Sequence, residues 1–111
     1  MTSEDLLYTA LSSVMPTFHL AMDGEQAAAA VYRENAPGIV YESGEPIITT
    51  DRYDIEVYQK EHDPDNIESI VQALHAAGFF ARISGAQTMV DYEGAGYSVD
   101  RLSASRTRGM E

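Results

Sequence analysis

The chain has no cysteine, no tryptophan and no long apolar run. Without cysteine it can form no disulfide framework, no thiolate nucleophile and no cysteine-ligated metal or iron–sulfur centre. The first five residues, Met1–Asp5, lack the basic and apolar regions of a signal peptide. No stretch approaches the roughly 18 apolar residues that a membrane-spanning helix needs. We therefore expect a soluble protein that stays in the cytoplasm.

Basic residues are also scarce, because seven Lys and Arg stand against eighteen Asp and Glu, for a net charge of −11. A charge of this sign repels phosphate backbones and anionic lipids, so we expect no direct binding to nucleic acid or to a membrane. The sign reverses at the C-terminal end, where Arg101, Arg106 and Arg108 face a single acid, Glu111. A basic segment on an acidic body could dock on a neighbouring copy of the chain.

A length of 111 residues with 44% hydrophobic residues fits one domain with one core. We place this domain at residues 1–102. Residues 103–111 are small, polar and basic, which predicts a flexible basic tail.

Two helices are predicted. Residues 3–14 carry apolar side chains at helical spacing, with Thr2 or Ser3 as N-cap and Pro16 beyond the C-terminal end. The second helix begins with Asp63 as N-cap and Pro64 at the first helical position, and Gly78 ends it. The alanine-rich segment 25–33 has helix propensity but no amphipathic pattern, so it is predicted to be a surface helix or a loop.

Several segments of the remaining chain are predicted to be strands. Tyr53, Ile55 and Val57 alternate with polar neighbours, which predicts a strand over 52–59 with one buried face. It is expected to pair antiparallel with 39–42 across a long loop of about nine residues. Further extended segments are 17–22, 79–83, 88–92 and 97–102. The predicted fold is α+β, with a mostly antiparallel sheet of about five strands, two helices packed on one face, and the order α-β-β-β-α-β-β.

No residue pattern predicts catalysis. Glu61, His62, Asp63 and Asp65 superficially resemble a metal site, but capping and helix-dipole roles explain the aspartates better. The glycine pair at 94–96 lacks the third glycine and the helix of a dinucleotide loop. We therefore expect no catalytic, cofactor-binding or metal-binding residue, no cofactor and no enzymatic activity.

Surface residues that suit protein contacts are more informative. Tyr58 shares a strand face with Asp54 and Glu56, which predicts an exposed aromatic side chain, a type enriched at protein interfaces. The predicted loop carries two adjacent isoleucines that a partner could cover. The candidate interface residues are Glu45, Pro46, Ile47, Ile48, Arg52, Tyr58, Arg101, Arg106 and Arg108.

The order of these elements resembles a known family. The elements that carry the resemblance are the helix Leu6–Val14, the strands Ala36–Tyr41 and Tyr53–Tyr58, the Asp63-Pro64 helix entry with Gly78 at its end, and two closing strands. Together they are similar to the tail completion, or tail terminator, proteins of long non-contractile-tailed bacteriophages and prophages. The resemblance covers residues 3–102. The alanine-rich segment 25–33 and the arginine tail 103–111 have no counterpart in that family.

This resemblance implies a function in assembly. It implies a homo-oligomeric ring, commonly a hexamer, that sits on the last ring of the tail tube, halts tube polymerisation and presents a surface to the connector of the head. The protein would occur in the cytoplasm of the bacterial host during assembly and then in the virion tail. The long loop at 43–52 would lie at the lumen or the tube contact, and the sheet edges at subunit contacts.

Three other functional classes remain alternatives. A small-molecule-binding or sensing domain of ferredoxin-like shape would need an apolar pocket with convergent polar groups. An enzyme would respond to a metabolite or a metal in a thermal-shift experiment. A head-closure or neck protein of the virion would share the assembly role without capping tail tubes.

Overall fold

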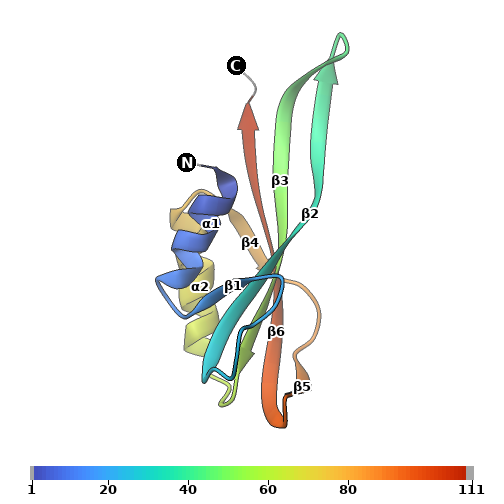
Figure 1. Ribbon diagram of the computed structural model, residues 1–111. Helices are drawn as coiled ribbons and strands as arrows, with labels where there is room; N and C mark the ends of the chain where they lie inside the picture. The colour runs from blue at the N-terminus through green and yellow to red at the C-terminus, as the bar shows by residue number, and fades with distance from the viewer. Residues whose placement is uncertain (1, 110–111) are drawn as a thin grey trace.

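The computed structural model describes residues 2–109, and the predicted α+β class is confirmed. Two helices, α1 (Ser3–Ser12) and α2 (Pro64–Ala76), lie on one face of a single sheet (Figure 1). The strands are β1 (Thr17–His19), β2 (Ala28–Glu42), β3 (Glu45–Gln59), β4 (Phe80–Ile83), β5 (Thr88–Tyr92) and β6 (Ala95–Gly109). All three extended segments predicted after the second helix are strands, so the sheet has six strands, one more than the predicted order α-β-β-β-α-β-β counts.

The sheet runs in the order β1-β2-β3-β6-β4, and every pairing is antiparallel except that of β1 with β2. The long strand β6 pairs with β3 along one side. Its other side pairs first with β5, through residues 95–99, and then with β4, through residues 102–105. The chain therefore closes by inserting its last strand into the middle of the sheet.

Both helices begin as their sequences predict. Thr2 and Asp5 form a reciprocal capping box at α1, with each backbone N–H donating to the other side chain at 3.1 Å. Asp63 caps α2 and accepts from the backbone N–H of Asp65 at 3.0 Å. These caps satisfy donors that the helix itself leaves unpaired.

The core has two parts, one on each face of the sheet. The larger part lies between the helices and the sheet and includes Leu7, Leu11, Ile55 and Leu74, all fully buried. The smaller part lies on the opposite face around Tyr97 and Val99. Residues 20–27 cover it, because the hydroxyl of Tyr97 donates to the backbone oxygen of Gln26 at 2.7 Å, and that of Tyr92 to Met22 at 2.7 Å.

Three local predictions are wrong, and the first is that for the alanine-rich segment 25–33. Residues 25–27 are a loop, one of the two predicted alternatives, but residues from Ala28 onward form β2. Ala30 packs into the helix-side core and Ala29 into the opposite core, and both are 0% exposed. This segment pairs with β1 and β3 and is buried on both faces of the sheet, and these tertiary contacts outweigh the helix propensity of alanine.

The second correction concerns the loop predicted at 43–52. β2 and β3 continue to a two-residue turn at Ser43 and Gly44, whose φ angles of 53° and 81° are both positive. This is the geometry of a tight hairpin turn whose twist matches the flanking strands. Glu45 to Arg52 therefore lie within β3 and not in a loop.

The third correction concerns the predicted flexible tail. Residues 103–109 continue β6 and pair with β3 as far as Gly109 opposite Ile48. The last two residues of that predicted tail, 110 and 111, lie outside the described part of the chain. Its basic character did not prevent pairing, because β3 supplies a long partner strand and acidic side chains beside it.

Candidate functional site

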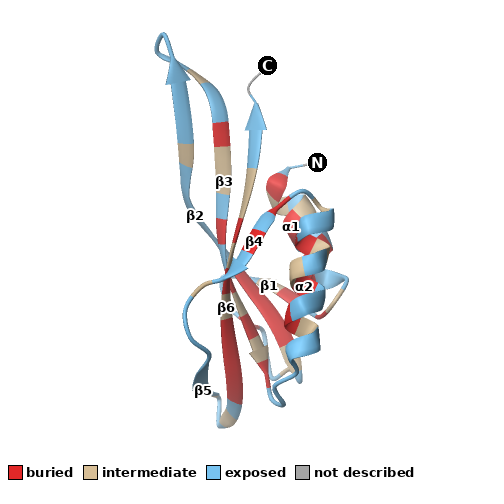
Figure 2. Cartoon of the chain, turned by 180° about the vertical axis from the view of Figure 1, so that it is seen from behind, coloured by how far each residue is buried: buried red, intermediate tan, exposed pale blue. Residues whose placement is uncertain are grey.

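One end of the sheet extends beyond the helices. We call it the arm, and it consists of residues 35–52 of the β2–β3 hairpin with residues 106–109 of β6. The molecule measures 53 × 24 × 23 Å, and the arm forms one end of its long axis (Figure 1). Most of the arm is exposed on both faces, whereas the part of the sheet beside the helices is largely buried (Figure 2).

The arm exposes large apolar side chains. Val40 and Ile48 are direct cross-strand partners and are 52% and 39% exposed. Tyr41 is 59% exposed, and Ile39 and Ile47 are also exposed. Apolar area of this extent on a narrow projection is typical of a surface that another molecule covers.

The arm also has two open strand edges. β1 pairs with β2 only from Ala30 to Tyr32, so among residues 2–109 the outer edge of β2 beyond Tyr32 has no strand partner. β4 pairs with β6 only as far as Ser105, so among residues 2–109 no strand continues along the outer edge of β6 beyond that residue. The β2 edge is interrupted by an irregularity between Asn35 and Gly38, a device that limits unspecific edge pairing.

The structure places five of the nine predicted interface residues on the β3 strand of the arm, and two more, Arg106 and Arg108, lie on its β6 strand. Glu45, Pro46, Ile47 and Ile48 lie next to the turn, and Arg52 lies at the base. The guanidinium group of Arg52 covers Gly38, where an added Cβ would meet Nη2 at 2.8 Å. The guanidinium group of Arg52 therefore occupies space that a larger side chain at position 38 would need.

Four of the nine predicted residues, Arg106 and Arg108 included, contact their own chain. Tyr58 is half-buried and packs edge-on against Tyr97 at 6.0 Å between ring centroids, so the prediction of an exposed aromatic is wrong. Arg101 pairs with Glu56 at 3.5 Å and donates to Thr88 at 3.0 Å. Arg106 and Arg108 both take part in a cluster at the base of the arm.

This cluster, which we call the latch, consists of Ser3, Asp51, Arg106 and Arg108. The hydroxyl of Ser3 donates to Asp51 Oδ2 at 2.5 Å and accepts from Arg106 Nη1 at 3.0 Å. Arg108 Nε donates to the same carboxylate oxygen at 2.9 Å. Partial burial by itself would raise the pKa of Asp51, but the hydrogen bonds from Arg108 and Ser3 outweigh it and hold that pKa below its ordinary value. The latch joins α1 to β3 and β6.

A cleft of about 400 Å³ lies between α2 and the sheet. Its walls are mostly apolar and include Ile67, Val71 and Ile83, while His62 and Asp100 supply polar groups. Asp100 is 9% exposed, and its Oδ2 atom accepts no hydrogen bond from the described residues. His62 Nε2 lies 3.2 Å from this oxygen without the alignment of a hydrogen bond. His62 therefore faces this carboxylate while its side chain stays exposed to solvent.

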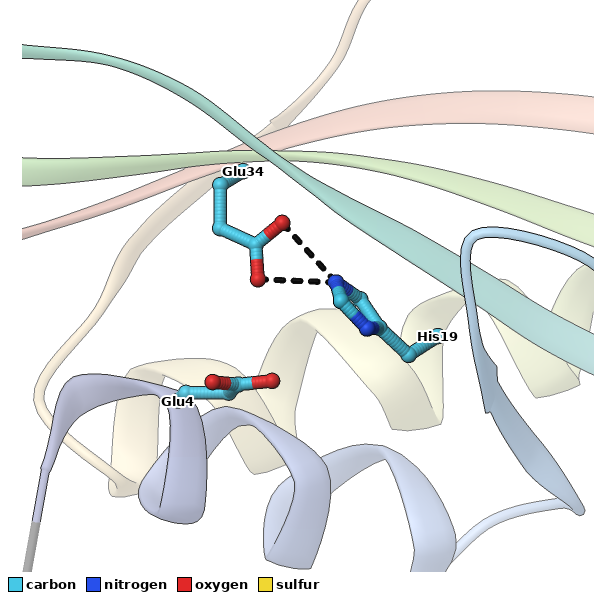
Figure 3. A group of neighbouring side chains, drawn as sticks. All are labelled: Glu4, His19 and Glu34. Atoms are coloured by element: carbon cyan, nitrogen blue, oxygen red, sulfur yellow. Dashed lines mark hydrogen bonds and ion pairs between the residues drawn. The ribbon is translucent and has the colours of Figure 1, made fainter.

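No sequence pattern groups Glu4, His19 and Glu34, which come from α1, the end of β1 and β2. In the fold they face a common space (Figure 3). His19 Nε2 lies 2.8 Å from each carboxylate oxygen of Glu34. The parallel pairing of β1 with β2 brings His19 near Glu34, and the hydroxyl of Tyr32 on β2 holds Glu4 beside them. No local motif signals either contact.

The comparisons with known proteins give no family. No protein-family model matches the chain, and no curated protein matches it. Within residues 2–109, neither helix combines the length and the apolar character required to cross a membrane. Function must therefore be argued from the geometry.

Proposed function

We propose that this protein is a self-associating assembly protein of the tail completion class, which forms a ring on the end of a phage tail tube, stops tube growth and joins the tail to the head. The observation that supports this most directly is the arm, with exposed apolar side chains on a projecting hairpin and open edges on both outer strands. The family resemblance of the sequence adds the particular role.

A second copy of the chain is the partner that the arm fits best. The two open edges belong to different strands, β2 and β6, so contact between the edge of one copy and the other edge of the next is heterologous. Heterologous contacts close into rings when the rotation between copies permits it. A net charge of −11 on each copy opposes association, so the attraction must come from the apolar arm. Because salt screens the repulsion between copies, salt should strengthen association.

The first test is the oligomeric state. Light scattering coupled to size exclusion, over a concentration series in low and high salt, should detect oligomers that negative-stain microscopy resolves as rings. Ile48→Lys places a charge on the arm and should abolish them. Met89→Lys is the matched control, because Met89 is 74% exposed on β5, away from the arm.

The second test addresses the particular role. Tail-tube protein from the same virus or prophage is polymerised with and without the chain, and tube lengths are measured by microscopy. The chain should shorten the tubes and appear at one end, and Ile48→Lys should do neither. A wild-type chain that stays monomeric and leaves tube length unchanged would refute the proposal. Rings that form without tube capping would instead favour a head-closure or neck protein.

The cleft beside α2 favours a second candidate, small-molecule binding. An apolar cleft with a nearly buried carboxylate that accepts no hydrogen bond suits a small apolar amine. Benzylamine and related aromatic amines should raise the melting temperature of the wild type but not of Asp100→Asn. Asp91→Asn, at an exposed position on β5, is the control. Equal responses of all three proteins would remove this candidate.

A further inference from the structure

Glu4, His19 and Glu34 have the residue types and the convergence of a metal site. Each offers one ligand atom, an imidazole nitrogen or a carboxylate oxygen, and these atoms all lie within 4.8 Å of one another. Ligand atoms around one zinc-sized ion lie about 3–3.5 Å apart, because each is about 2.0–2.2 Å from the metal. Small side-chain rotations therefore suffice to bring all three onto one ion.

The three side chains are positioned by separate elements and by a buried tyrosine. Tyr32 is 4% exposed and its ring stacks on His19 at 5.0 Å between centroids. The hydroxyl of Tyr32 donates to Glu4 Oε2 at 2.8 Å. One rigid core residue thus orients two of the three ligands, as supporting residues do around protein metal sites.

The electrostatics of the group also favour a cation. Glu4 and Glu34 bring two carboxylates to one space, and His19, when neutral, does not offset their charge. The side chains of His19 and Glu34 are 41% and 49% exposed, so an ion can enter and water can complete its coordination.

We propose that Glu4, His19 and Glu34 form a binding site for one divalent transition-metal ion of the Zn²⁺ type. One nitrogen with two carboxylate ligands suits borderline ions such as Zn²⁺ and Co²⁺ better than Mg²⁺ or Ca²⁺, which take oxygen ligands. The bound ion connects α1 with β1 and β2. None of the three residues belongs to the arm, so the metal-site proposal is tested independently of ring formation.

The test uses the full chain after chelator treatment. Calorimetric titration with Zn²⁺ should give one ion per chain, and Co²⁺ should produce visible d–d absorption. His19→Ala and Glu34→Gln should each weaken Zn²⁺ binding at least tenfold and remove the cobalt spectrum. Tyr32→Phe keeps the stacking ring but removes the hydroxyl, and it should weaken binding by about 10- to 100-fold.

Matched controls separate this site from other surface histidines. His75→Ala and His62→Ala remove the two remaining histidines and should leave Zn²⁺ affinity within twofold of the wild type. Circular dichroism of each variant checks that it folds. Undiminished binding in both folded variants, His19→Ala and Glu34→Gln, would overturn the proposal. Failure of the wild type to bind Zn²⁺ or Co²⁺ at millimolar concentration would do the same.

Discussion

The strands β2 and β3 pass through two environments, the body under the helices and the arm beyond them. In the body, Ile55 is fully buried between the helices and the sheet. In the arm, Ile48 on the same strand is 39% exposed. The residue type and the strand are the same, but the two side chains point to opposite faces of the sheet. The body has a core on each face, whereas most of the arm is covered on neither, so the covering layers make the difference. Strand pairing holds the arm together, but it does not bury its side chains.

This contrast separates stability from function. The body has apolar packing on both faces of the sheet and accounts for the folding free energy. The arm has one buried polar residue, Thr49, and little apolar burial of its own. A projection that contributes little to folding but exposes isoleucine, valine and tyrosine is consistent with the proposed contact with a second copy of the chain.

The largest predicted effect comes from making the same substitution, isoleucine to alanine, once in the body and once in the arm. Ile55→Ala should lower the free energy of unfolding by about 2–5 kcal/mol, because it leaves a cavity in the core. Ile48→Ala should lower it by less than about 1 kcal/mol in the monomer. Urea denaturation at low protein concentration measures both. Similar losses from the two substitutions would mean that the arm is packed as tightly as the body.

The next effect concerns the latch between the two regions. Asp51→Asn should cost about 1–3 kcal/mol, because Ser3 and Arg108 lose a charged acceptor. The folded pKa of Asp51 lies below the ordinary value of 3.8, so its stabilisation is full above that pH and is lost as the pH falls through the folded pKa.

Melting temperatures of the wild type and Asp51→Asn should therefore differ most at neutral pH and converge in acid, below the ordinary carboxyl pKa. Asp54→Asn is the control, because Asp54 is exposed on the opposite face of β3. A difference between wild type and Asp51→Asn that persists unchanged in strong acid would show that the latch does not depend on the carboxylate charge.

The smallest effect is local to the arm. Gly44 has a φ of 81°, so Gly44→Ala should cost about 1–2 kcal/mol of strain at the turn. Amide hydrogen exchange should accelerate in residues 35–52, while exchange in α1 and α2 stays unchanged. Gly96→Ala is a useful control, since an added Cβ there meets no atom within 4 Å and its φ is not positive. Faster exchange throughout the body would contradict the separation of the two regions.

The same contrast explains which features could be predicted. The helices were predictable because their signals are local: Asp63 and Pro64 begin α2, and its apolar side chains repeat at helical spacing. The alternation of Tyr53, Ile55 and Val57 likewise predicted the body part of β3. Residues 39–42 of the arm were predicted as a strand, but the arm part of β3 was missed. Glu45, Pro46, Thr49 and Thr50 do not alternate with apolar residues, and a strand exposed on both faces leaves no such pattern.

Residues of the candidate sites were likewise predictable where their role depends on local sequence, and not where it depends on distant contacts. Ile47 and Ile48 were predicted from the sequence as exposed apolar residues, and they are exposed in the structure, though on a strand. Arg106 and Arg108 were assigned to a free tail, but their contacts with Ser3 and Asp51 join residues far apart in the chain. Glu4, His19 and Glu34 could not be grouped at all.

The sequence by itself determined the α+β class, the two capped helices and the acidic charge of the chain, because each depends on composition or on residues a few positions apart. Only the tertiary structure decided that alanines 28–30 form a strand, that β6 enters the middle of the sheet, and that a histidine and two glutamates meet. The physical reason is that burial and strand pairing are set by partners distant in sequence, and these partners override local propensity.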